Sequence, residues 1–88
     1  MSAFLSAANK GHTAVVDILL AQPDIDVNLK DHFGHTALHL AVEEGMEGVV
    51  HSLLAYPHTD ANAVSDEGKT VLSSAALSGS ATIMVALV

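Results

Sequence analysis

The sequence predicts an all-α fold, a short solenoid of stacked helix pairs joined by polar loops that project to one side. Three observations support this prediction. The 88-residue chain repeats itself every 34 residues, as Gly11, Gly45 and Gly79 illustrate, and such a period is typical of stacked-repeat proteins. Apolar residues recur at helical spacing between glycine or proline breaks. The apolar half of the composition is mostly Ala, Leu and Val, and these small side chains suit closely packed helices.

The repeat is most complete over residues 31–64, with partial copies over residues 1–30 and 65–88. We therefore predict a single domain, residues 1–88, because a chain of this length holds at most one small domain. The residues that return at the same step are Ala7, Ala41 and Ala75; Leu19-Leu20, Leu53-Leu54 and Leu87-Val88; Asp26-Val27-Asn28 and Asp60-Ala61-Asn62; and Gly34 and Thr36 with Gly68 and Thr70.

Charge and composition exclude several classes of function. The formal net charge is −7, and Lys10, Lys30 and Lys69 are the only fixed cations. A basic patch for phosphate backbones is therefore missing, so we expect no nucleic-acid partner, and anionic membrane surfaces are disfavoured for the same reason. The chain has no cysteine, which excludes disulfides, thiolate metal sites and a cysteine nucleophile.

The first partial copy is expected to hold two helices. Residues 1–10 align with the first helix of the central copy, and Gly11 separates them from a second helix, Thr13 to Leu20. In that second helix Val15, Ile18 and Leu19 keep the i, i+3, i+4 spacing of a buried stripe. Pro23 follows because proline cannot continue the helical hydrogen-bond ladder.

The central and third copies repeat this plan after polar loops. Asp26 to His35 is a loop suited to a tight turn or hairpin, and Thr36 is a good N-cap for the next helix. Thr70 is the equivalent cap in the third copy, whose second helix is expected over Ile83 to Val88. The residues expected to face inward are Leu38, Ala41, Val42, Val49, Val50, Leu53 and Leu54 in the central copy, which breaks at Gly45 and Pro57, and Leu72, Ala75 and Ala76 in the third, which breaks at Gly79.

The central copy resembles an ankyrin repeat. It reads D-x-x-G-x-T-A-L-H-x-A over residues 31–41, then Gly45, V-V-x-x-L-L over residues 49–54 and D-A-N over residues 60–62. The resemblance covers nearly the whole chain as one full and two partial repeats. It implies an ankyrin-repeat solenoid of antiparallel helix pairs with hairpin-like loops, and a role in protein–protein recognition without catalysis.

The resemblance also implies a binding surface made by the loop tips and the exposed side of each first helix. We favour Phe33 as an anchor that fills a pocket of the partner, while a ring folded back on the loop base stays open as an alternative. The acidic balance favours a basic partner. The candidate partner-binding residues are His32, Phe33, His35, Leu40, Glu43, Glu44, Asp66, Glu67, Lys69, Leu77 and Ser78, with Asn9 and Lys10 in the first copy.

No catalytic or metal-binding motif is present among the six histidines, ten acidic residues and many serines. Neither H-E-x-x-H nor another zinc spacing occurs, and we expect no enzyme activity, cofactor or metal. His39 matches the histidine of the family motif, for which the resemblance implies a structural role, tying the helix start to the neighbouring turn.

Three further interpretations stay open. The chain resembles a piece of a longer repeat array, or its uncapped apolar ends associate with other copies. It is alternatively a structural spacer within a larger protein. Residues 70–88 carry no charge and approach the ~20 residues that cross a bilayer, so a tail-anchored membrane protein is the third possibility. The start of the chain lacks a secretory signal, and we expect a cytoplasmic or nuclear location.

Overall fold

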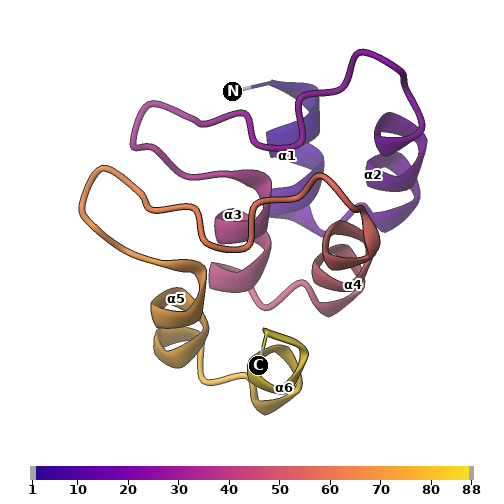
Figure 1. Ribbon diagram of the computed structural model, residues 1–88. Helices are drawn as coiled ribbons and strands as arrows, with labels where there is room; N and C mark the ends of the chain where they lie inside the picture. The colour runs from indigo at the N-terminus through magenta and orange to yellow at the C-terminus, as the bar shows by residue number, and fades with distance from the viewer. Residues whose placement is uncertain (1, 88) are drawn as a thin grey trace.

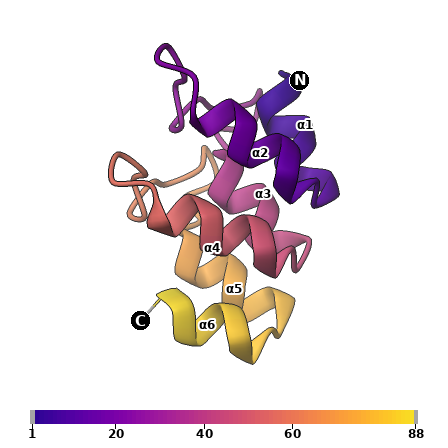
Figure 2. The same cartoon turned by 90° about the vertical axis from the view of Figure 1, so that its right-hand side faces the viewer.

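The computed structural model describes residues 2–87, and within them it contains three helix pairs (Figure 1). The inner row contains α1, α3 and α5, which contact one another in order, and the outer row contains α2, α4 and α6. Figure 2 shows the pairs stacked one above the next. This is the predicted all-α solenoid. The bounds are α1 (Ala3–Lys10), α2 (Thr13–Leu20), α3 (Ala37–Glu43), α4 (Glu47–Ala55), α5 (Val71–Ser78) and α6 (Ala81–Leu87).

Two long loops, residues 21–36 and 56–70, connect the pairs and project to the same side of the stack (Figure 1). Each loop crosses over to the next inner helix. The second loop closes on itself through an antiparallel bridge between Val64 and Thr70. The helices, rather than the loops, therefore form the stack, and the loops line one edge of it.

The three inner helices begin in the same way, as the repeated sequence predicts. Ser2, Thr36 and Thr70 are extended N-cap residues, and each hydroxyl accepts a hydrogen bond from the amide three residues on, at 3.2, 3.4 and 3.1 Å. Such a cap satisfies one of the free amides of the first turn. At the other end Gly11 and Gly79 cap α1 and α5 with φ of +75° and +74°, the left-handed conformation that glycine adopts without strain.

The core runs through the centre of the stack, and most of the predicted inward positions of the central copy are buried. Leu38 is 2 % exposed, Leu53 is fully buried, and Leu54 is half-buried at the margin. The remaining members, Ala41, Val42, Val49 and Val50, are fully buried. The small side chains allow the inner helices to lie close together, as the composition indicates.

Two inward predictions for α2 are wrong. Val15 is 44 % exposed and Ile18 is 62 % exposed, and the buried valine of this helix is Val16. At Val15 the physical reason is stacking order, whereas the equivalents of Ile18 in the later copies are themselves only half-buried. Val49 on α4 is the equivalent of Val15 one repeat later, and it is fully buried because α2 packs against α4. No helix among residues 2–87 covers Val15 on α2 in the same way.

The prediction for α5 is wrong at two positions for the same reason. Leu72 is 46 % exposed and Ala76 is exposed, while Ala75 is buried as expected. Leu38 on α3, the equivalent of Leu72, is buried because α5 packs against α3. No further helix among residues 2–87 covers Leu72 on α5. The last helix also begins earlier than predicted, at Ala81, and the end of the predicted range, Val88, lies outside the described residues.

Candidate functional site

The tip of the first loop is shaped by the side chain of Asp31. Its carboxylate accepts hydrogen bonds from the amides of Phe33 and His35, both at 2.9 Å, while the amide of Asp31 donates to the carbonyl of His35 at 2.9 Å. Burial raises the pKa of Asp31, but these backbone hydrogen bonds and the nearby His35 outweigh burial, so the pKa lies below its usual value. The loop is therefore held by an ionised carboxylate.

Gly34 brings the first loop tip against the second. It has φ of +78°, and a Cβ at this position would lie only 2.7 Å from the backbone nitrogen of Asp66. The contact is used, because the amide of Asp66 donates a 3.0 Å hydrogen bond to the carbonyl of Phe33. Glycine here satisfies both the turn and the close approach, and the two tips are joined by backbone.

The second tip has a weaker version of the same turn. Ser65 stands where Asp31 stands in the first loop, and its hydroxyl accepts one hydrogen bond, from the amide of Lys69 at 3.2 Å. The amide of Ser65 donates to the carbonyl of Lys69 at 2.9 Å. The neutral Ser65 hydroxyl, which accepts one hydrogen bond, thus replaces the charged Asp31 carboxylate, which accepts two.

His39 connects the start of α3 to the second loop, as the resemblance implied. Its Nε2 lies 3.0 Å from the carbonyl of Lys69, and its Nδ1 lies 3.0 Å from Thr36 Oγ1 and accepts from the Thr36 amide at 3.3 Å. Burial lowers the pKa of His39, and the hydrogen bond to Lys69 opposes this shift only in part. The ring is therefore neutral, with the proton on Nε2, and its role is structural.

His35 lies between two carboxylates on the surface beside the first tip. Its Nδ1 is 3.6 Å from Asp31 Oδ2 and its Nε2 is 3.7 Å from Glu43 Oε1. Glu43 also accepts a long 3.5 Å hydrogen bond from Ser74 on α5. The ring of Phe33 lies 6.2 Å from the ring of His35, centroid to centroid. Loop, α3 and α5 thus meet on one surface.

Most predicted partner-binding residues lie on this surface, which we call the loop-tip face. Phe33 is 64 % exposed and Leu77 is 76 % exposed. His35 and Lys69 are half-buried beside it. At the end of α1, Asn9 is half-buried and Lys10 is exposed. The loop-tip face consists of His32, Phe33, Glu43, Glu44, Asp66, Glu67, Leu77 and Ser78, all exposed except for the half-buried Glu43.

Leu40 does not belong to this surface, so its predicted place on an exposed helix side is wrong. Leu40 is 7 % exposed and packs in the core. Its equivalents in the other copies are Ser6 and Ser74. A leucine at this position buries apolar area against the neighbouring helix, because exposing it to water would cost free energy.

Two features were not predicted. The amide of Asn28 clamps the first loop to the second: its Nδ2 donates to the carbonyl of His58 at 2.9 Å, and its Oδ1 accepts from the amide of Asp60 at 2.8 Å. The sequence signal for this clamp is the Asp-x-Asn motif, which returns as Asp60-Ala61-Asn62.

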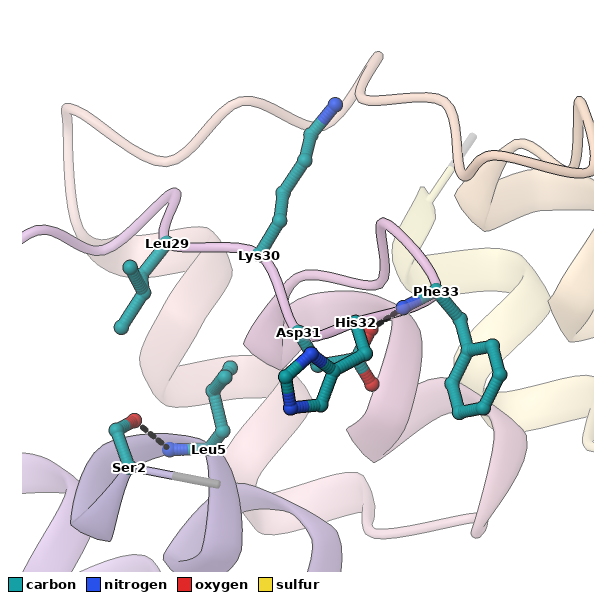
Figure 3. Close-up of a pocket in the computed structure, with 7 residues that line it drawn as sticks. All are labelled: Ser2, Leu5, Leu29, Lys30, Asp31, His32 and Phe33. Carbon is teal, nitrogen blue, oxygen red and sulfur yellow. Dashed lines mark hydrogen bonds between the residues drawn. The ribbon is translucent and has the colours of Figure 1, made fainter.

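The second feature that was not predicted is a cavity of about 260 Å³ beside the first tip, in which Leu29 and Leu5 form an apolar wall and Lys30 points away (Figure 3).

Residues 2–87 hold no group of three or more histidine, aspartate or glutamate side chains placed to bind a metal ion. Over the same residues, no helix combines the length and the apolar character needed to cross a membrane. The uncharged stretch weighed as a tail anchor is divided at Gly79 into α5 and α6.

Stacked helix pairs, a repeated cap at each inner helix and hydrogen-bonded loop tips define a helical-repeat solenoid. The family model described as ankyrin repeats in three copies matches residues 2–88. The chain therefore belongs to the ankyrin-repeat family. Repeats of this family are in general non-catalytic scaffolds that bind other proteins.

The crystal structure of the human ASB11 ankyrin repeat domain is similar, with a TM-score of 0.89 and 31 % sequence identity. The match covers 99 % of this chain and 38 % of the ASB11 chain, so this chain spans well under half the length of that relative. A comparison with curated proteins found no match.

Proposed function

We propose that the chain is a protein-binding module and that its loop-tip face binds a partner protein through Phe33. The observation that carries this proposal is a large aromatic side chain, 64 % exposed, on a backbone that is hydrogen-bonded on both sides. The Phe33 amide donates to Asp31 and its carbonyl accepts from Asp66. Because this backbone is already fixed, binding has to order only the Phe33 side chain, and aromatic anchors are prominent among the residues that dominate interface energies.

Charge on the same face supports a basic partner. The face carries four carboxylates, those of Glu43, Glu44, Asp66 and Glu67, in addition to its two apolar side chains. Of the lysines near it, Lys69 is half-buried in the second loop and Lys30 lines the cavity beside the first tip. With a net charge of −7 over the whole chain, a partner segment carrying lysine or arginine beside an apolar residue is steered to this face and orients on it.

A peptide selection tests the proposal without a known partner. A random-peptide library displayed on phage is selected on the immobilised chain, and the recovered peptides are assayed on Phe33→Ala, Glu43→Lys and Val85→Ala. Val85 is the matched control, since it is 74 % exposed on α6 but lies outside the loop-tip face. We expect recovered peptides to be enriched in Lys and Arg, and to lose at least about tenfold in affinity on Phe33→Ala but not on Val85→Ala.

The alternative role as a structural spacer predicts a different result. Peptides would then be absent, or would bind wild type and Phe33→Ala equally. Circular dichroism of each variant accompanies the assay, so that lost binding is separated from lost helicity. Equal binding to all three variants would overturn the proposed surface.

A further inference from the structure

The two ends of the helix stack each expose apolar side chains that are buried at the equivalent positions inside it. We call the side of α1 and α2 that faces away from α3 and α4 the leading face. The side of α5 and α6 that faces away from α3 and α4 is the trailing face. The step of 34 residues allows each exposed position to be compared with its buried equivalents.

The leading face is apolar along α2 and the adjoining loop. Val15 is 44 % exposed, whereas its equivalents Val49 and Ile83 are 0 % and 1 % exposed. Leu29 is 39 % exposed, and its equivalent Ala63 is 6 % exposed. These positions are buried wherever a preceding helix pair and loop lie beside them.

The trailing face shows the complementary pattern on α5. Leu72 is 46 % exposed, whereas its equivalents Phe4 and Leu38 are 4 % and 2 % exposed. Ala76 is exposed as well, although Ala8 and Val42 at the same position are fully buried. No charged side chain occurs from Thr70 onward, so desolvating the side chains of this face removes no side-chain charge from water.

We propose that the trailing face of one copy binds the leading face of a second copy, so that the stack continues from one molecule into the next. The contact repeats the interface already present between the helix pairs within the chain. This inference concerns the ends of the stack and does not depend on the function proposed for the loop-tip face.

Shape supports this head-to-tail pairing over pairing of like faces. Inside the stack α1 contacts α3 and α3 contacts α5. At each of these contacts two residues are buried: the large residue on the trailing side, Phe4 or Leu38, and the small or branched residue that begins the next helix, Ala37 or Val71. Leu72 offers the same projection, and the exposed Ala3 offers the same recess. Two trailing faces would instead oppose one leucine to another, leaving neither recess filled.

The outer helices preserve this fit at their closest approach. Within the chain α2 and α4 meet where a Cβ on Gly48 would lie 2.8 Å from Thr13 Oγ1. Between two copies the same two positions are occupied by Ala14 and Ala81, both exposed. Ala14 stands in the place of Gly48 and adds a methyl group, while Ala81 stands in the place of Thr13 and lacks its hydroxyl. The outer helices of two copies can therefore lie as close together as α2 and α4 do within one chain.

Two single-site variants provide a decisive test because each blocks one face. Val15→Glu places a carboxylate on the leading face and Leu72→Glu places one on the trailing face, and burying either unpaired charge should weaken association by about 100-fold or more. Wild type and variants are compared by sedimentation across protein concentration, with circular dichroism to verify folding. Val85→Glu is the matched control, because its equivalents Asp17 and His51 are also exposed.

Wild type and Val85→Glu should associate increasingly with concentration, and more strongly at high salt, because salt screens the repulsion between two acidic chains. Val15→Glu alone and Leu72→Glu alone should remain monomeric. A mixture of the two should form a 1:1 dimer and nothing larger, since each retains one intact face and a head-to-tail interface otherwise adds copies without limit.

Three results would overturn the proposal. Wild type could remain monomeric at all concentrations and salt levels. Val15→Glu alone could dimerise, which would mean that like faces pair. The mixture of folded variants could remain monomeric while wild type associates, which would place the contact elsewhere. Phe33→Ala should associate as wild type does, so the result is independent of the loop-tip face.

Discussion

The starts of α3 and α5 have nearly the same local cap, but only the start of α3 is hydrogen-bonded to the next loop by the residue that completes its cap. Thr36 and Thr70 each cap their helix, and residue 39 or 73 bonds back to complete a capping box. His39 is fully buried and also reaches the carbonyl of Lys69 in the next loop. Ser73 is exposed, and its hydrogen bonds are to Thr70 in its own turn. The cap is a local property, whereas coupling between repeats depends on side-chain length.

The largest expected effect is obtained by making α3 start as α5 does. His39→Ser keeps a hydroxyl for the cap but removes one of the two hydrogen bonds to the Lys69 carbonyl, which keeps the Ser65 amide as a donor, and it opens a buried space. We expect a loss of about 2–4 kcal/mol in the free energy of unfolding, measured by urea denaturation. Ser73→His is the reciprocal control and should change stability by less than about 0.5 kcal/mol. Equal effects of the two changes would contradict the comparison.

The pH dependence of stability separates the same two helix starts. The pKa of His39 is lowered in the folded state by burial, so the unfolded chain binds a proton more readily than the folded one. The stabilisation is present above the unfolded pKa of about 6.5 and is lost as pH falls through the lower folded pKa. Wild type should therefore lose stability on acidification more steeply than His39→Ser, with unfolding free energies measured across that range. Parallel curves would contradict this prediction.

The two Asp-x-Asn loops offer a smaller comparison. Asn28 bonds to His58 and Asp60 in the next loop, whereas the hydrogen bond in which Asn62 takes part is local, from its amide to Asp60. Asn28→Ala should lower the free energy of unfolding by about 1 kcal/mol because two backbone groups lose their partner. Asn62→Ala is the matched control and should have little effect. Chemical denaturation of both variants measures the difference. Equal losses in the free energy of unfolding would contradict a stabilising role for the Asn28 hydrogen bonds between the loops.

The sequence was sufficient for the features that depend on neighbours along the chain. Capping residues and glycine breaks act within one or two turns, and together with the 34-residue step they correctly predicted the six helices of residues 2–87 and their family. Val15 and Leu72 show what such signals lack. Helical periodicity identifies the apolar side of a helix, but only the stacking order determines whether another helix covers it.

The candidate surface was predictable to a similar extent. Phe33 and Leu77 are exposed as expected, since residues at a loop tip or helix end have few neighbours to pack against. Leu40 is placed on the surface by its position in the family pattern, but its burial depends on packing within the core, which no local pattern records. The Asn28 clamp joins residues 30 or more apart in sequence, so only the folded loops reveal it. The partner-binding role itself stays a prediction.

The smallest expected effect concerns α1, whose start has the local cap alone. Leu5 stands in the place of His39, and Ser2 has φ of −69° and ψ of 162°, a conformation that suits a residue before proline. Ala3 is exposed at the first helical position, where the amide has no intrahelical partner to lose. Ala3→Pro should therefore stabilise the fold by about 0.5 kcal/mol by restricting the unfolded chain. Ala7→Pro, inside the same helix, should instead cost about 3 kcal/mol or more. Thermal unfolding at low protein concentration measures both changes, and destabilisation by Ala3→Pro would mean that the start of α1 is held by more than its cap.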